Sequence, residues 1–150
     1  MTTTPKQGAH DTPTKPIPKI EAAMAPFFAA AKKHRLVVQR CTDCGTLRFP
    51  ARELCSTCLG STTEWIAVSG RGEIFSYNVM HQVYHPAFAD DVPYAVVIVK
   101  LAEGPMMTTS LLDCPLERVR IGAAVEVAFE DLSTDVTLPK FRLSGASEQP

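Results

Sequence analysis

Apolar and polar residues follow the period of β-strands through the second half of the chain. Five short runs are predicted as strands, at residues 73–81, 94–101, 106–112, 124–129 and 141–143. In the first run Phe75, Tyr77 and Val79 share one face, and the second run is almost continuously apolar, as in a strand buried on both faces. Five successive short strands indicate a mainly β protein that contains a five-stranded barrel of the OB type.

Residues 21–34 follow the spacing of a helix instead, with Met24, Phe27, Phe28 and Ala31 at helical intervals. The helix docks either on its own domain or on a partner. Phe27 and Phe28 are adjacent and cannot both point in one direction, which favours contacts on two sides. A short strand at 36–39 leads from this helix toward the first cysteine.

Four of the five cysteines form two C-x-x-C pairs, Cys41 with Cys44 and Cys55 with Cys58, separated by ten residues. Each pair lets one tight turn aim two sulfur atoms at one point, and two facing turns create the tetrahedral thiolate site that structural zinc prefers. Four cysteines leave the metal no open position, so we expect a zinc ion without a catalytic role. Cys114 stands apart and is expected to be an ordinary packed thiol.

Other interpretations of the cysteines stay open at this point. A redox dithiol also uses C-x-x-C, although two close pairs outside a βαβ unit argue against it, and iron is a possible alternative to zinc. Gly45 and Gly60 are expected to take positive φ where the chain leaves each turn. Arg40, Arg48 and Arg52 are either solvated surface or offset the negative charge of the thiolates.

Length, charge and composition narrow the possible functions. The chain has 150 residues, 45% of them hydrophobic, enough for an ordinary core, and its net charge is −1. This charge, together with 7% aromatic residues, gives no electrostatic case for binding nucleic acid or a membrane surface. The first 19 residues lack the apolar stretch of a signal peptide, so a cytoplasmic location is expected.

The same patterns predict four segments. Residues 1–19 contain four prolines and five threonines and are expected to form a flexible tail. Residues 20–40 are the helix and its lead-in strand, residues 41–65 the zinc ribbon, and residues 66–145 the OB-fold barrel.

The order of these features resembles a known family. The helix, the cysteines and the barrel carry a string of further residues in a fixed order: Phe27-Phe28, Leu36, Phe49-Pro50, Arg52, Trp65, Ser69-Gly70-Arg71-Gly72, His81, Phe88, Pro93, Glu103-Gly104, Ile121-Gly122 and Leu138-Pro139. Over residues 20–143 this string resembles the small zinc-ribbon plus OB-fold proteins associated with acyl-CoA metabolism.

The resemblance implies a function as well as a fold. Family members are partners of thiolase-type enzymes, of related aldolases and of hot-dog enoyl-CoA hydratases in lipid, steroid side-chain or aromatic acid metabolism. It implies a non-catalytic accessory subunit that binds acyl-CoA, with structural Zn²⁺ as its cofactor and with the catalytic residues supplied by the partner enzyme.

Four residues are candidates for contact with CoA or with the partner. Arg71 lies in a short glycine-rich segment, which is either a tight bend or a surface that meets a CoA phosphate. His81, Tyr84 and Phe88 belong to a loop, residues 81–93, that either binds or covers the end of the barrel.

Two alternative functions remain. A single-stranded nucleic-acid-binding OB protein would need a basic groove with exposed aromatic residues. A stand-alone acyl-CoA hydratase or thioesterase would need His81 or His85 as its general base.

Overall fold

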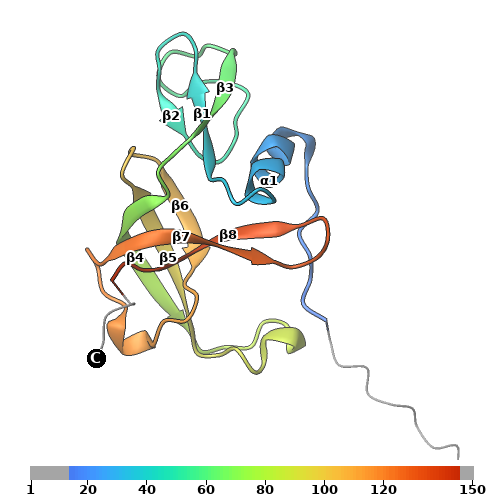
Figure 1. Cartoon of the computed structure of the whole chain (residues 1–150), viewed down its shortest axis with the longest axis vertical. Coiled ribbons are helices and arrows are strands. Elements are labelled where there is room, and N and C mark those ends of the chain that lie inside the picture. The colour runs from blue at the N-terminus through green and yellow to red at the C-terminus, as the bar shows by residue number, and fades with distance from the viewer. Residues whose placement is uncertain (1–13, 146–150) are drawn as a thin grey trace, which may run out of the picture.

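The computed structural model describes residues 14–145 and contains two sheets, one short α-helix and three 3₁₀ turns (Figure 1). The elements are η1 (Ala22–Met24), α1 (Ala25–Ala31), β1 (Val37–Cys41), β2 (Leu47–Arg48), β3 (Thr63–Ala67), β4 (Arg71–Met80), η2 (Pro86–Phe88), β5 (Tyr94–Leu101), β6 (Met106–Ser110), η3 (Leu116–Arg118), β7 (Ala124–Asp131) and β8 (Thr137–Leu143).

The larger sheet forms the barrel, with the strand order β6-β5-β4-β7-β8 and antiparallel pairing throughout. A parallel bridge between Leu111 and Phe141 brings β8 back beside the end of β6 and nearly closes the sheet. Side chains such as Ile74, Val97 and Phe141 fill the interior and are fully buried. The prediction of a mainly β protein with a five-stranded OB-type barrel is confirmed.

Two details of the barrel strands differ from expectation. On β5 the inward side chains, for example Val97 and Val99, are buried, but the outward ones, Val96 and Ile98, are only half-buried, because a barrel wall has a single inner face. On β4 the register shifts between Ile74 and Ser76, which places a β-bulge at Phe75 and interrupts the strict alternation.

The smaller sheet, with the order β2-β1-β3, belongs to the ribbon. β1 pairs antiparallel with both neighbours and carries buried Val37 and Val38 toward the barrel. Strand β3 was not among the predicted strands. Figure 1 shows the ribbon above one end of the barrel, with α1 beside it and facing β8.

The α-helix is shorter than the predicted range of 21–34, because residues 22–24 form the 3₁₀ turn η1 and α1 ends at Ala31, where the chain turns through His34. His34 adopts a left-handed main-chain conformation, with φ of 54°. Its N–H donates to the carbonyl of Ala31, and the N–H of Arg35 donates to the carbonyl of Ala30. These are the two hydrogen bonds of a Schellman motif, which satisfies the last carbonyls of a helix.

An extended segment, residues 14–20, precedes the helix and runs along the barrel. No main-chain hydrogen bond joins these seven residues to the rest of the described chain. Lys15 instead makes an ion pair with Asp91, at 2.5 Å, and lies over the ring of Phe88. The first 13 residues of the predicted tail lie outside the described residues. Between residues 14 and 145 no helix is long and apolar enough to cross a membrane.

Candidate metal centre and the surfaces around it

The four cysteines of the two pairs meet at one point of the ribbon. Cys41 is the last residue of β1, and the other three lie in the turns that follow. Their Sγ atoms all lie within 4.8 Å of one another, and the pairs Cys41–Cys58 and Cys44–Cys55 are each 3.6 Å apart. Tetrahedral zinc with Zn–S bonds of about 2.3 Å holds its sulfur atoms about 3.8 Å apart. The cluster therefore fits a zinc ion.

Two similar turns carry the ligands. The N–H of Gly45 donates to the carbonyl of Cys41, and the N–H of Leu59 donates to the carbonyl of Cys55, both at 2.9 Å. Gly45 has the expected positive φ, of 78°. In the second turn the prediction for Gly60 is wrong, because Leu59 takes the left-handed conformation, with φ of 62°. A Cβ on Gly60 would lie 2.1 Å from Oδ2 of Asp43 and 3.2 Å from the Sγ atom of Cys58, so this glycine lets the chain pass close to Asp43 and to a ligand.

The thiol groups are electrostatically unequal. Main-chain N–H groups of Cys58 and Thr57 lower the pKa of Cys55 to about 6. The N–H of Gly60 lowers the pKa of Cys58, but its contacts with the other thiols and its partial desolvation outweigh this effect and raise that pKa to about 12. Four neighbouring thiolates repel one another, and a divalent cation at the centre removes this obstacle to ionisation.

Of the three arginines near the ligands, Arg48 is buried. Its Nε donates to Oε1 of Gln39, and one of its terminal nitrogens donates to the carbonyl of Arg52, both at 2.9 Å. The N–H of Arg52 also donates to Oε1 of Gln39. This network fixes the 49–52 loop to β1, a role for Gln39 that no sequence pattern indicated. Arg40 pairs with Glu64 on β3.

The four predicted CoA or partner contacts do not form one cluster. Arg71 is the first residue of β4, and His81 directly follows the last residue of the same strand. The two are ten positions apart along an extended strand, which corresponds to about 30 Å along the chain. Tyr84 is 70% exposed in the loop beyond His81, whereas Phe88 is half-buried in η2. His81, Tyr84 and Phe88 thus share the 81–93 loop, and Arg71 lies apart.

The glycine-rich segment before β4 is a tight bend. Gly70 has φ of 76°, and a Cβ there would lie 2.4 Å from Cγ1 of Val127 on β7. The N–H of Ser69 donates to Oε1 of Glu103 at 2.7 Å, which holds the bend against the β5–β6 turn. Arg71 follows this bend and its side chain is exposed.

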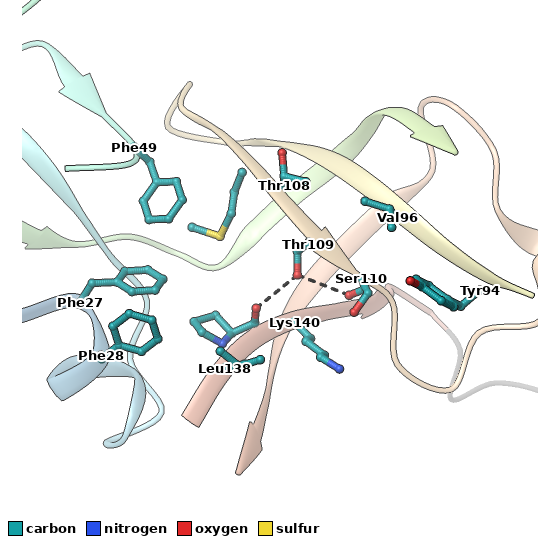
Figure 2. Close-up of a pocket in the computed structure, with 12 residues that line it drawn as sticks. Phe27, Phe28, Phe49, Tyr94, Val96, Thr108, Thr109, Ser110, Leu138 and Lys140 are labelled. Atoms are coloured by element: carbon teal, nitrogen blue, oxygen red, sulfur yellow. Dashed lines mark hydrogen bonds between the residues drawn. The ribbon is translucent and has the colours of Figure 1, made fainter. Parts of the chain in front are cut away.

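The structure also contains a groove that the sequence did not reveal. A cavity of about 370 Å³ lies where β6 and β8 approach each other, and the rings of Phe27, Phe28 and Phe49 gather at one end of it (Figure 2). In its middle the hydroxyl of Thr109 donates to the carbonyl of Pro139, at 3.2 Å. The lining comes from α1, the ribbon and the barrel, so no single stretch of sequence announces it.

A second cavity, of about 760 Å³, lies beneath the segment that contains Lys15. It shares four lining residues with the first cavity, namely Tyr94, Ser110, Leu138 and Lys140.

Comparison with known families agrees with this architecture. Residues 28–64 match a family described as the rubredoxin-like zinc ribbon domain of ChsH2, and residues 65–130 match its C-terminal OB-fold domain.

Individual relatives extend the match. The chain is 36% identical over 135 residues to a probable enoyl-CoA hydratase alpha subunit of Thermomonospora curvata, covering 90% of this chain and 42% of that subunit. It is 38% identical over 105 residues to a DUF35 domain-containing scaffold protein of Methanocaldococcus jannaschii, covering 69% of this chain and 74% of the relative. The chain thus spans less than half of the hydratase subunit but most of the scaffold protein.

Among solved structures, a chain of the Ltp2-ChsH2(DUF35) aldolase superimposes with a TM-score of 0.77 and 37% identity, covering 85% of this chain and 99% of that one. The fold, the four-cysteine site and these matches agree. This chain belongs to the DUF35 family, in which a ChsH2-type zinc ribbon precedes an OB-fold domain, and its Cys41, Cys44, Cys55 and Cys58 bind a structural zinc ion.

Proposed function

We propose that this protein is a non-catalytic accessory subunit in acyl-CoA metabolism, which binds acyl-CoA and assembles with a hydratase, aldolase or thiolase-like enzyme. The match to nearly the whole length of one chain of the Ltp2-ChsH2(DUF35) aldolase carries this proposal. The names of two curated relatives, a hydratase alpha subunit and a scaffold protein, support it.

The metal centre is consistent with a supporting role. A catalytic zinc keeps an open coordination position for water or substrate, whereas four cysteines occupy all four positions of a tetrahedral ion. His85 is also engaged, because its Nδ1 accepts the N–H of Ala87 and caps η2. In our proposal the partner enzyme therefore supplies the catalytic groups.

Exposed apolar side chains offer surfaces to a partner. Leu54 and Leu59 lie near the zinc site, and Val83 and Tyr84 lie in the 81–93 loop; all four are exposed. Aromatic anchors such as Tyr84 often dominate binding energy at protein interfaces. We assign this loop, with His81 and Phe88, to contact with the partner, and Arg71, at the other end of β4, to a separate contact with CoA or with the partner.

Co-expression tests the proposal. The protein is produced with candidate hydratase, aldolase and thiolase-like subunits, and each pair is analysed by size-exclusion chromatography and by enzyme assay. We expect one partner to co-elute and to lose activity or solubility when this protein is absent.

A matched pair of variants locates the interface. Tyr84→Glu places a charge in the proposed contact and should weaken the complex at least about tenfold, the equivalent of ~1.4 kcal/mol. Ile121→Glu changes a similarly exposed side chain in the turn before β7 and should leave the complex unchanged. Separate elution from every candidate, with unaltered partner activity, would refute the accessory role.

The four-segment division at residues 19, 40 and 65 and the cytoplasmic location stay predictions.

A further inference from the structure

The two cavities beside β6 and β8 adjoin each other, because they share four lining residues, and we treat them together as one groove. Their volumes, about 370 and 760 Å³, fall in the range of ligand pockets, roughly 300–1,000 Å³. Such pockets are lined mainly by apolar and aromatic side chains, with few polar groups. Figure 2 shows this character, with phenylalanine rings at one end and Tyr94 toward the other.

The chemistry of the lining changes along the groove. At the ribbon end the ring centroids of Phe27 and Phe49 are 5.0 Å apart, and Phe28 packs edge-on against Phe27. The middle carries the hydroxyl groups of Thr109 and Ser110. The groove therefore runs from a purely apolar end to an uncharged polar middle.

Most of the charged side chains at the other end are paired, and Asp131, whose carboxylate accepts a hydrogen bond from the hydroxyl of Thr137, adds one net negative charge there. Lys140 pairs with Glu130, and Lys15 pairs with Asp91. With these partners, neither lysine offers an unpaired positive charge to an anionic ligand. The groove is therefore suited to a ligand that has a long apolar part followed by an uncharged polar group.

The roof over the second cavity can open without disturbing a sheet. Residues 14–18 line this cavity, and no main-chain hydrogen bond ties them to the rest of the described chain. Pro16 and Pro18 have no N–H to donate. The side chain of Lys15, on Asp91 and Phe88, is the polar tether of this segment. Loss of this ion pair would leave the described part of the segment held by the apolar contacts of its side chains, which a hydrocarbon ligand can replace.

We infer that this groove binds the hydrocarbon chain of an acyl thioester. The chain lies against Phe27, Phe28 and Phe49, and the uncharged thioester lies beside Ser110, with the remainder of the ligand leaving past Lys140. This inference rests on the proposed function, because it places the acyl part of the acyl-CoA ligand. The competing occupant is an apolar side chain of a partner protein.

The test uses the full chain alone and compares free CoA, acetyl-CoA, octanoyl-CoA and dodecanoyl-CoA by isothermal titration calorimetry. Burial of a methylene group contributes up to about 0.8 kcal/mol, which is about fourfold in affinity. We expect affinity to rise steadily from acetyl-CoA to dodecanoyl-CoA by up to this factor for each added methylene.

A block at the junction of the two cavities should remove the dependence on chain length. Ser110→Trp fills the shared part of the groove, and Ser110→Leu fills less of it. Affinity for dodecanoyl-CoA should fall toward that for free CoA in the first variant and by an intermediate factor in the second. Ser76→Trp is the matched control, because Ser76 is also a half-buried strand serine but does not line the groove. Zinc content and the unfolding midpoint confirm that each variant folds.

A probe without CoA separates this inference from the proposed function. Dansyl-undecanoic acid should bind with increased fluorescence, and Ser110→Trp should abolish the increase. Equal affinity for CoA and every acyl-CoA, with no probe binding, would overturn the inference that the groove binds an acyl chain. This result would favour a partner side chain as the occupant of the groove and would leave the accessory role intact. Probe binding without any response to CoA compounds would support the groove and overturn CoA binding.

Discussion

Main-chain conformation at single residues decides where the local elements of this protein end. His34 is left-handed and terminates α1, and Leu59 is left-handed and completes the second zinc turn. Such conformations are costly for residues with a Cβ, by roughly 1–2 kcal/mol. Their use here shows that the hydrogen bonds and the metal ligands around them, and not local preference, set these turns.

Two glycines with similar φ isolate the effect of close packing. Gly70 has φ of 76° and faces Val127, whereas Gly122 has φ of 84° and open space where a Cβ would project. Gly122→Ala should cost about 1 kcal/mol from the main chain alone. Gly70→Ala should cost a further 1–3 kcal/mol or so from overpacking. Urea unfolding of both variants gives the two values, and equal losses would contradict a close approach at Gly70.

At the scale of single residues, prediction from the sequence succeeds where a residue type in a given spacing has only one common structural role. The four cysteines and Gly45 were placed correctly because spacing and chemistry together leave little choice. Gly60 was assigned positive φ, but the adjacent Leu59 takes it, because the sequence shows a tight turn without showing which residue bears the unusual φ. The burial of Arg48 depends on Gln39 and Arg52, which only folding brings together.

At the scale of elements, the ribbon is too small to stand without its metal. Its sheet has three strands, and β2 consists of two residues. So little sheet buries few side chains, and the zinc ion supplies the missing folding free energy.

Removal of one ligand should therefore unfold the ribbon. Cys55→Ser replaces a fully buried ligand and should lower the zinc content from about one ion per chain to near zero, with loss of ordered ribbon signals in NMR spectra and a lower unfolding midpoint for the barrel that shares its core. Cys114→Ser is the control, since this thiol lies outside the cluster and its pKa is raised by partial burial. Full zinc retention by Cys55→Ser would show that this residue is not a ligand.

Strand prediction was most accurate where the pattern was strongest. The run at 94–101 coincides with β5. Strand β8 begins at Thr137, four residues before the predicted start at 141, and it includes Pro139. The main chain of Pro139, however, faces away from β7, and the carbonyl of Pro139 accepts a hydrogen bond from the hydroxyl of Thr109. A proline is tolerated in a strand where no ladder donor is needed. The five residues of β3 give too weak a signal and form a strand through pairing with β1.

At the scale of the whole molecule, the ribbon and the barrel share one core. The cluster of buried side chains runs from Phe27 and Val38, in α1 and β1, to Ile74 and Phe141 in the barrel. A core that is continuous across two sheets couples their unfolding.

We therefore expect a single cooperative transition. Trp65, the one tryptophan of the sequence, lies in β3 and reports on the ribbon by fluorescence, whereas far-UV circular dichroism is dominated by the barrel. The midpoints of the two signals in urea should coincide, as in two-state unfolding. An earlier midpoint for Trp65 fluorescence would show that the ribbon unfolds separately.

This scale is also where prediction from sequence ends. The groove takes its walls from α1, the 49–52 loop, β6 and β8, which approach one another only in the folded chain. Likewise, Arg71 and His81 were both candidates for contact with CoA or a partner, but an extended strand places them at opposite ends of β4.

The tether between Lys15 and Asp91 makes the roof of the groove responsive to ionic strength. Both side chains are partly exposed, so added salt weakens their attraction more than it would weaken that of a buried pair. Added salt loosens the roof and accelerates entry into the groove, whereas it slows any ligand drawn in by long-range attraction between charges. The sign of the salt effect on the association rate thus distinguishes opening of the roof from electrostatic steering.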